Sequence, residues 1–183
     1  MAMTPRPRRS ILYMSGSNAR ALEKGRSLAA DGLIFDLEDS VAPDAKETAR
    51  SQILDALNEG GYGHRELIVR VNAMDSPWGK KDITTMATSG AHGILLPKVN
   101  SAVMVQEAEA LMAASNAPDE MTIWTMMETP LGILHGKEIA FSSPRMGAFV
   151  LGTSDLAKDL HCAHTQERLP MITSLGLCML AAR

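Results

Sequence analysis

Six short apolar runs, each followed by a longer segment with helical spacing, set the strongest limit on what this chain can fold into. The runs occupy residues 10–14, 32–35, 66–71, 93–97, 121–127 and 147–152. Between and after them, apolar residues recur with helical spacing, for example over 44–57, 101–114 and 169–183. Apolar strands that alternate with helices are typical of parallel sheets buried on both faces. The pattern therefore predicts an α/β fold, either an open doubly wound sheet or a (β/α)8 barrel.

Local signals define the segments between the strands. Pro43 and Asp44 predict a helix start, and "DITTMATSGAH" predicts a helix that ends at Gly90. No Gly-Ser linker or charge block divides the chain. With 183 residues, of which 45% are hydrophobic, we expect residues 1–183 to form a single domain with its own core.

Composition removes several classes of function. A net charge of -3 and the absence of a basic stripe argue against nucleic-acid binding. The apolar runs are too short to cross a membrane, so no membrane association is expected. Two cysteines without a C-x-x-C motif, Cys162 and Cys178, fit a reducing cytoplasm.

The first residues carry several arginines, Arg6, Arg8 and Arg9, and no acid precedes Glu23. The apolar stretch that follows is too short for the hydrophobic region of a secretory signal. We therefore predict a cytoplasmic protein, or one of the mitochondrial matrix if its source is eukaryotic.

Polar side chains follow the carboxyl ends of the apolar runs from the second onward. They are Asp36, Glu38 and Asp39, then Arg70 and Asn72, then Lys98, then Glu128, and last Asp155. In parallel α/β folds the carboxyl ends of the strands line the active site. We therefore expect these residues to lie together in space, although they are scattered along the sequence.

The residue types at these ends indicate a metal-assisted site. Glu128 and Asp155, with water and a substrate oxygen, suit a hard divalent ion such as Mg²⁺. Arg70 offers a planar pair of donors for a carboxylate or an enolate oxygen, and Lys98 adds positive charge. Each also has an ordinary structural explanation. Asp155 alone suits a helix N-cap, Arg70 a structural ion pair, and Thr129 a helix start.

Other motifs carry less weight. His161, Cys162 and His164 have metal-ligand side chains, but no second ligand pair follows them, so we expect an ordinary loop. The sequence has neither a G-x-G-x-x-G motif after a strand nor a P-loop, which argues against a dinucleotide or nucleotide triphosphate enzyme.

Several stretches together resemble one enzyme family. They are "RRSILYMSGSN", "ADGLIFDLEDSVAPDAK", "VRVNAMDSPW", "GILLPKV", "METPLGI" and "VLGTSDLAKDL". In this order they are similar to the citrate lyase β-subunit-like group of the HpcH/HpaI aldolase superfamily, which includes malyl-CoA and citramalyl-CoA lyases. The resemblance covers nearly the whole chain.

The resemblance implies a TIM barrel and a Mg²⁺-dependent carbon–carbon lyase, with Mn²⁺ as an alternative metal. Its substrate would be a 3-hydroxyacyl-CoA ester such as malyl-CoA, citramalyl-CoA or citryl-CoA, cleaved to an acyl-CoA and an oxo-acid, or formed from them. Family members form homo-oligomers, so a trimer or hexamer is expected.

The resemblance also assigns roles to individual residues. Glu128 and Asp155 look like metal ligands, and Arg70 and Glu128 like the catalytic pair that also binds substrate with Lys98. Glu38 and Asp39 would hydrogen-bond metal-bound waters. Arg20 and Lys24 look like the residues that contact the phosphates of coenzyme A.

Two departures from the family pattern stand out. Ser15-Gly16 replaces the Pro-Gly that usually follows the first strand. The chain also holds about six of the eight expected strand-helix units, so it is expected to be truncated at its C-terminus, without the acid that serves proton transfer in relatives.

Three alternatives to the lyase remain open from the sequence. One is hydrolysis of the malyl-CoA thioester, which a metal and an arginine would also serve. A second is a non-catalytic remnant that binds metal or coenzyme A. The third, more remote, is a receiver-like signalling domain. Such a domain has an acid cluster at one strand end and a lysine at a later one, and Asp36, Asp39 and Lys98 would imitate them.

Overall fold

Six strands lie in one parallel sheet whose spatial order repeats their order in the chain. The computed structural model describes residues 8–183 and contains β1 (Ile11–Ser15), β2 (Gly32–Asp36), β3 (Glu66–Arg70), β4 (Gly93–Leu96), β5 (Thr122–Met127) and β6 (Met146–Leu151). Each strand pairs with the next in the order β1-β2-β3-β4-β5-β6. A doubly wound sheet reverses its strand order at a switch point, so that alternative, and with it the receiver-like domain, is wrong. The sheet is a curled partial barrel, and the six predicted strands are confirmed.

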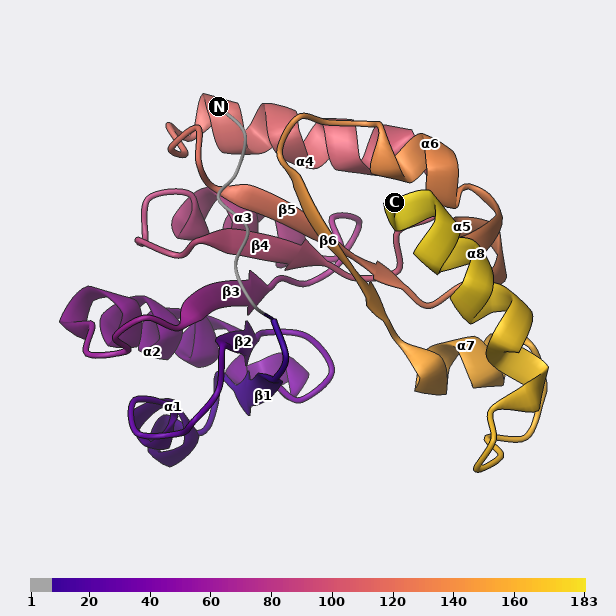
Figure 1. Cartoon of the computed structure of the whole chain (residues 1–183). Helices are drawn as coiled ribbons and strands as arrows, with labels where there is room; N and C mark the ends of the chain where they lie inside the picture. The colour runs from indigo at the N-terminus through magenta and orange to yellow at the C-terminus, as the bar shows by residue number, and fades with distance from the viewer. Residues whose placement is uncertain (1–7) are drawn as a thin grey trace.

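Helices succeed one another around the outside of the curled sheet, from the indigo to the yellow end of the chain (Figure 1). They are α1 (Ala19–Gly25), α2 (Lys46–Glu59), α3 (Gly79–Met86), α4 (Ala102–Ala114), α5 (Pro130–Leu134), α6 (Gly136–Ala140), α7 (Thr153–Asp159) and α8 (Ile172–Ala182). Single 3-10 turns, Pro43–Ala45 and Leu169–Met171, precede α2 and α8.

The helix predicted to end at Gly90 ends earlier, at Met86. The Ser89 hydroxyl donates to the Met86 carbonyl at 2.9 Å, which gives the chain an alternative to the next helical turn. Gly90 then takes a left-handed φ of 82°, where glycine is favoured. The turn chemistry therefore prevails over the helical spacing of the apolar residues.

Alternation along the strands creates two apolar layers. One set of side chains, including Phe35, Val69 and Ile94, packs in the large cluster that joins the sheet to the helices. The other set forms a separate cluster inside the curl, made of Ile34, Ile68, Leu95, Trp124 and Met126.

Two positions beyond Ile34 and Ile68 on the same face come Asp36 and Arg70. Period-two alternation thus aims these two polar side chains at the mouth of the curl, above its apolar interior.

The outer strands β1 and β6 each pair on one side only within the described residues. Every residue of β6 is partly exposed, whereas β2 to β5 are buried throughout. Cys162 and Cys178 are free thiols. None of the helices within residues 8–183 has the length and apolar character to cross a membrane. Arg6, one of the basic residues considered in a targeting role, lies outside the described residues.

Candidate active site

A buried arginine lies at the centre of the acids that follow β2. The register between β2 and β3 places Asp36 directly opposite Arg70. Arg70 donates from Nε and Nη2 to the two Asp36 oxygens, each at 2.7 Å. Its Nη1 lies 3.0 Å from Glu38 Oε2 and 3.5 Å from Asp39 Oδ2. One cation therefore faces three carboxylates, which explains how "FDLED" tolerates its crowded negative charge.

These contacts change the acidity of the group. Burial lowers the pKa of Arg70, but hydrogen bonds to Asp36 outweigh it, and the pKa is raised overall. Burial raises the pKa of Asp36, and the same hydrogen bonds bring it below its ordinary value. Glu38 has no such bidentate partner, and burial raises its pKa despite the charge of Arg70. The planar donor pair predicted to bind substrate is thus occupied by Asp36, and Nη1 is the nitrogen that Asp36 does not bind.

Glu128 follows β5 and is 1% exposed. Its Oε1 accepts a hydrogen bond from the Lys98 backbone N–H at 2.8 Å. Burial raises the pKa of Glu128 to about 7; the Lys98 N–H opposes this shift, and the charges of Glu38 and Asp155 add to it. The carboxyl is therefore fixed in direction and poorly compensated in charge.

Lys98 connects Glu128 to the acids of β2. Its φ of 51° is left-handed, a conformation that costs energy for a residue with a side chain and often marks a functional position. Its backbone is directed at Glu128, while its Nζ lies 3.8 Å from Glu38 Oε1. One residue thereby contacts acids from two different strands.

Asp155 lies in the first turn of α7, directly after β6. The N-cap of that helix is Gly152, so the interpretation of Asp155 as an N-cap is wrong. Thr129, in contrast, does cap α5, and its hydroxyl accepts from the Gly132 N–H at 3.1 Å. Asp155 is therefore free of a capping role and lines the same cavity as Glu128.

Gly152 makes room for Glu128. A Cβ at this position would lie 2.3 Å from Glu128 Oε2 and 2.7 Å from Glu128 Cβ, far inside van der Waals contact. Gly152 has a φ of -89°, which any residue can adopt, so the requirement is for space and not for backbone conformation. The glycine thus fixes where the buried carboxylate can lie.

Replacing Gly152 by alanine is expected to displace Glu128 and to lower any Glu128-dependent activity by roughly 100-fold, because an error of about 1 Å in a reacting group has an effect of that size. Gly176 on α8 is the matched control, since a Cβ there meets nothing within 4 Å. Gly176→Ala should leave activity unchanged and raise the free energy of unfolding by up to about 1 kcal/mol. Equal activities of the two variants, measured beside thermal melts, would contradict this role of Gly152.

The mouth encloses a cavity of about 600 Å³, within the range of small-molecule sites. Asp36, Asp39, Arg70, Glu128 and Asp155 all contribute to its lining. The structure thus brings these strand-end residues together, with Glu38 and Lys98 in contact with them. The prediction is wrong for Asn72, which does not line the cavity and instead donates to the buried Asp82 on α3.

Tyr13 is a member of this site that sequence reasoning missed. Its ring lies over the Arg70 guanidinium at 5.1 Å, and its hydroxyl donates to Met126 Sδ at 3.4 Å. Burial raises the pKa of Tyr13 to about 12. It stands inside an apolar run, and only its place on the inner face of β1 distinguishes it.

The donor set suits Mg²⁺ held in part by water. Within residues 8–183 no group of three His, Cys, Asp or Glu side chains is arranged to hold a metal alone. Mg²⁺ commonly binds through one or two carboxylates and keeps several waters. Glu128 and Asp155 line one open cavity, and the raised pKa of Glu128 reflects burial that a cation would compensate. These two residues therefore fit the ion without a third protein ligand.

Two groups of predicted residues lie away from the acids. Arg20 and Lys24 are exposed on α1 and do not line the cavity. His161 and His164 lie in the irregular segment after α7, as expected for a loop.

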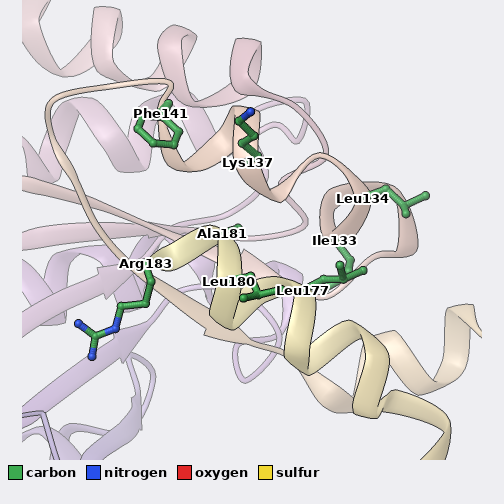
Figure 2. A pocket seen from close by; sticks show the side chains of 8 residues that line it. All are labelled: Ile133, Leu134, Lys137, Phe141, Leu177, Leu180, Ala181 and Arg183. Atoms are coloured by element: carbon green, nitrogen blue, oxygen red, sulfur yellow. The ribbon is translucent and has the colours of Figure 1, made fainter.

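A second hollow of about 400 Å³ lies between α8 and the α5–α6 segment (Figure 2). Its lining is apolar apart from Lys137 and Arg183 and contains no carboxylate. It therefore lacks the groups for acid–base or metal chemistry, and the mouth of the curl remains the candidate active site.

Known proteins share this fold. The crystal structure of CitE from Mycobacterium tuberculosis in complex with magnesium, acetoacetate and coenzyme A superposes with a TM-score of 0.73 at 24% identity, covering 96% of this chain and 63% of that one. At this identity the likeness establishes the curled barrel fold and nothing finer.

Relatives in sequence correct the predicted reaction. (3S)-malyl-CoA thioesterases from four strains of Cereibacter sphaeroides are 48% to 50% identical to the whole chain, which spans 62% of their length. The L-malyl-CoA/beta-methylmalyl-CoA lyase of the same species is 37% identical over 85% of the chain, which covers 51% of that enzyme. The prediction of a carbon–carbon lyase is therefore wrong, and the hydrolase alternative is favoured. The motifs named above left both reactions open, and the higher identity over the whole chain favours the hydrolase.

Residues 9–183 match the family described as HpcH/HpaI aldolase/citrate lyase, a family of enzymes. The match includes every strand of the sheet and every acid of the mouth. The chain belongs to the HpcH/HpaI aldolase/citrate lyase family.

Proposed function

We propose that this protein hydrolyses the thioester of a malyl-CoA-type substrate with the help of Mg²⁺. The observation that carries the proposal is 48% to 50% identity to (3S)-malyl-CoA thioesterases over the whole chain. The buried carboxylates around one open cavity support it, as does the magnesium and coenzyme A in the related CitE complex.

Glu128 and Asp155 would hold the ion, with Mn²⁺ as an alternative. When bound, Mg²⁺ supplies a Lewis acid for the oxygens of the substrate. Glu38 and Asp39, which contact Arg70 Nη1, would hydrogen-bond waters around the ion. The Lys98 backbone N–H keeps Glu128 aimed at the cavity.

Arg70 would bind the substrate through Nη1, since Asp36 occupies Nε and Nη2. A carboxylate or carbonyl oxygen at Nη1 would replace Asp39, which is 55% exposed and only 3.5 Å away. The Lys98 ammonium, 49% exposed, would add a second positive charge to the same approach.

Hydrolysis consumes one water. The water oxygen bonds to the thioester carbon, the carbon–sulfur bond breaks, and the sulfur leaves as coenzyme A after taking a proton. We assign the coenzyme A phosphates to Arg20 and Lys24, which are exposed on α1. This helix follows β1, whose last residue, Ser15, lines the cavity.

The domain organisation, cellular location and assembly of the protein stay predictions. They are a single barrel-type domain over residues 1–183, a cytoplasmic location and a homo-oligomeric assembly. The large core cluster, which contains residues from β1 to α8, supports the single domain.

The test is the product of (3S)-malyl-CoA incubated with the purified protein and millimolar Mg²⁺. We expect free coenzyme A thiol and malate in equal amounts, and no release when a chelator removes the metal. Acetyl-CoA and glyoxylate as products, or thiol release no faster than without protein, would overturn the proposal.

A further inference from the structure

A buried lysine lies directly behind the acids of the mouth. Lys46, the first residue of α2, is 6% exposed, although lysine is rarely buried. Its Nζ donates to the backbone carbonyls of Leu37 and Glu38, each at 2.7 Å. These carbonyls belong to the segment that carries Glu38 and Asp39, so the lysine holds the backbone of that segment through two hydrogen bonds.

The third side of the ammonium faces an aromatic ring. Nζ lies 5.5 Å from the centroid of Trp78, within the range of a cation–π contact. Two carbonyls and one ring thus surround the three N–H donors of Lys46. The ammonium therefore connects α2, the segment after β2 and the segment before α3.

A neighbouring buried network makes this anchor rigid. Arg50 on α2 donates to Asp82 Oδ1 at 2.6 Å. Asp82 Oδ2 accepts from the backbone and side-chain nitrogens of Asn72, at 3.0 and 2.6 Å. Asp82 is fully buried, so α2, α3 and the segment that follows β3 are held together. Lys46 extends from this fixed base.

These two hydrogen bonds hold the backbone from which the Glu38 side chain extends. Glu38 is the acid within 3.0 Å of Arg70 Nη1 and 3.8 Å of Lys98 Nζ. Its buried Oε2 has this ion pair with Arg70 but no hydrogen bond within the part of the chain that the structure describes. Whether the carboxylate reaches both Arg70 and Lys98 therefore depends on where its backbone lies.

We propose that Lys46 is a positioning residue, which holds the backbone of residues 37–38 so that Glu38 stays directed at Arg70 and Lys98 in the mouth. The inference rests on the proposed function for its effect on turnover, but not for its effect on the backbone. In this proposal Lys46 is more than an ordinary lysine at a helix start, and it does not contact the substrate.

The test compares Lys46→Met and Lys46→Gln, which remove the charge, with Lys46→Arg, which keeps it. Lys81→Met on α3 is the matched control, because Lys81 is exposed. We expect both neutral variants to lower kcat for malyl-CoA hydrolysis by about 10- to 100-fold with KM nearly unchanged, the effect known for groups that orient a metal site. Lys46→Arg should recover at least part of the loss, and Lys81→Met should match the wild type.

Hydrogen exchange of the 37–41 amides gives a readout independent of activity. The Leu37 N–H donates to the Arg70 carbonyl at 2.9 Å, and the Glu38 N–H to Asp36 at 2.8 Å. Both amides should exchange faster in the neutral variants, while the amides of β5 keep the wild-type rate. If Lys46→Met fails to melt cooperatively, Lys46→Gln is used in its place.

A folded neutral variant with wild-type exchange over residues 37–41 would overturn the inference. So would a loss of kcat that only follows the unfolded fraction, or a folded arginine variant no better than the methionine one. If the wild type hydrolyses nothing, the proposed function fails, and the exchange of the 37–41 amides still decides the role of Lys46.

Discussion

Replacing Glu128 by glutamine is expected to lower kcat for thioester hydrolysis by about 100- to 1000-fold and to abolish stabilisation of the protein by Mg²⁺. The amide keeps an oxygen that accepts from the Lys98 N–H and fills the same space beside Gly152. It loses the negative charge that a divalent ion needs. Loss of about 3 to 4 kcal/mol of electrostatic stabilisation corresponds to a rate effect of this size.

The same variant has a distinct effect on stability without metal. Burial raises the pKa of Glu128 from 4.5 to about 7, so the folded protein binds this proton more tightly than the unfolded chain. Between these two values Glu128 makes the wild type lose stability as pH rises, and the glutamine variant lacks this contribution. The variant should therefore gain in relative stability from pH 4.5 to 7 and remain constant above.

Thermal melts at several pH values, with and without millimolar Mg²⁺, measure both effects. Glu138→Gln, at an exposed position on α6, is the control and should respond to Mg²⁺ like the wild type. If Glu128→Gln and the wild type gain the same stabilisation from Mg²⁺, Glu128 is not a ligand of the ion.

The strand ends could be predicted from the sequence because parallel topology alone brings them to one edge. Arg70, Lys98, Glu128 and Asp155 each lie at or after the end of a different apolar run, and the sheet gathers them whatever its exact register. The barrel type was harder to establish, since strand order distinguishes it from a doubly wound sheet and periodicity carries no information on order.

Contacts that depend on register or on distant burial could not be predicted. The sequence shows Arg70 as a free donor pair, but the β2–β3 register places Asp36 opposite it and occupies two of its nitrogens. Lys46 has the pattern of a solvated lysine at a helix start, and its burial depends on Trp78, more than thirty positions away. The residue types at the strand ends left lyase and hydrolase open, and the identity to relatives over the whole chain favours the hydrolase.

Replacing Arg70 by methionine is expected to lower the free energy of unfolding by about 3 to 5 kcal/mol and to remove hydrolysis. Arg70 is 7% exposed, and its loss leaves Asp36 and Glu38 buried without their cation. Breaking one side of a buried ion pair has a cost of this order. For a protein of this size the melting temperature should fall by roughly 6 to 20 °C. Arg70→Lys should fall between, because one ammonium cannot meet both Asp36 oxygens as the planar pair does.

The double variant Asp36→Asn with Arg70→Met separates the structural role of Arg70 from its role toward substrate. The double variant has no carboxylate at position 36, so the main buried charge that Arg70 neutralised is gone. Much of the lost stability should therefore return in a melt. Hydrolysis should not return, because Nη1 is still absent from the mouth. If the double variant regains activity together with stability, Arg70 serves only to neutralise Asp36. If Arg70→Met alone melts like the wild type, the carboxylates around it do not depend on its charge, and the mouth must be stabilised in another way.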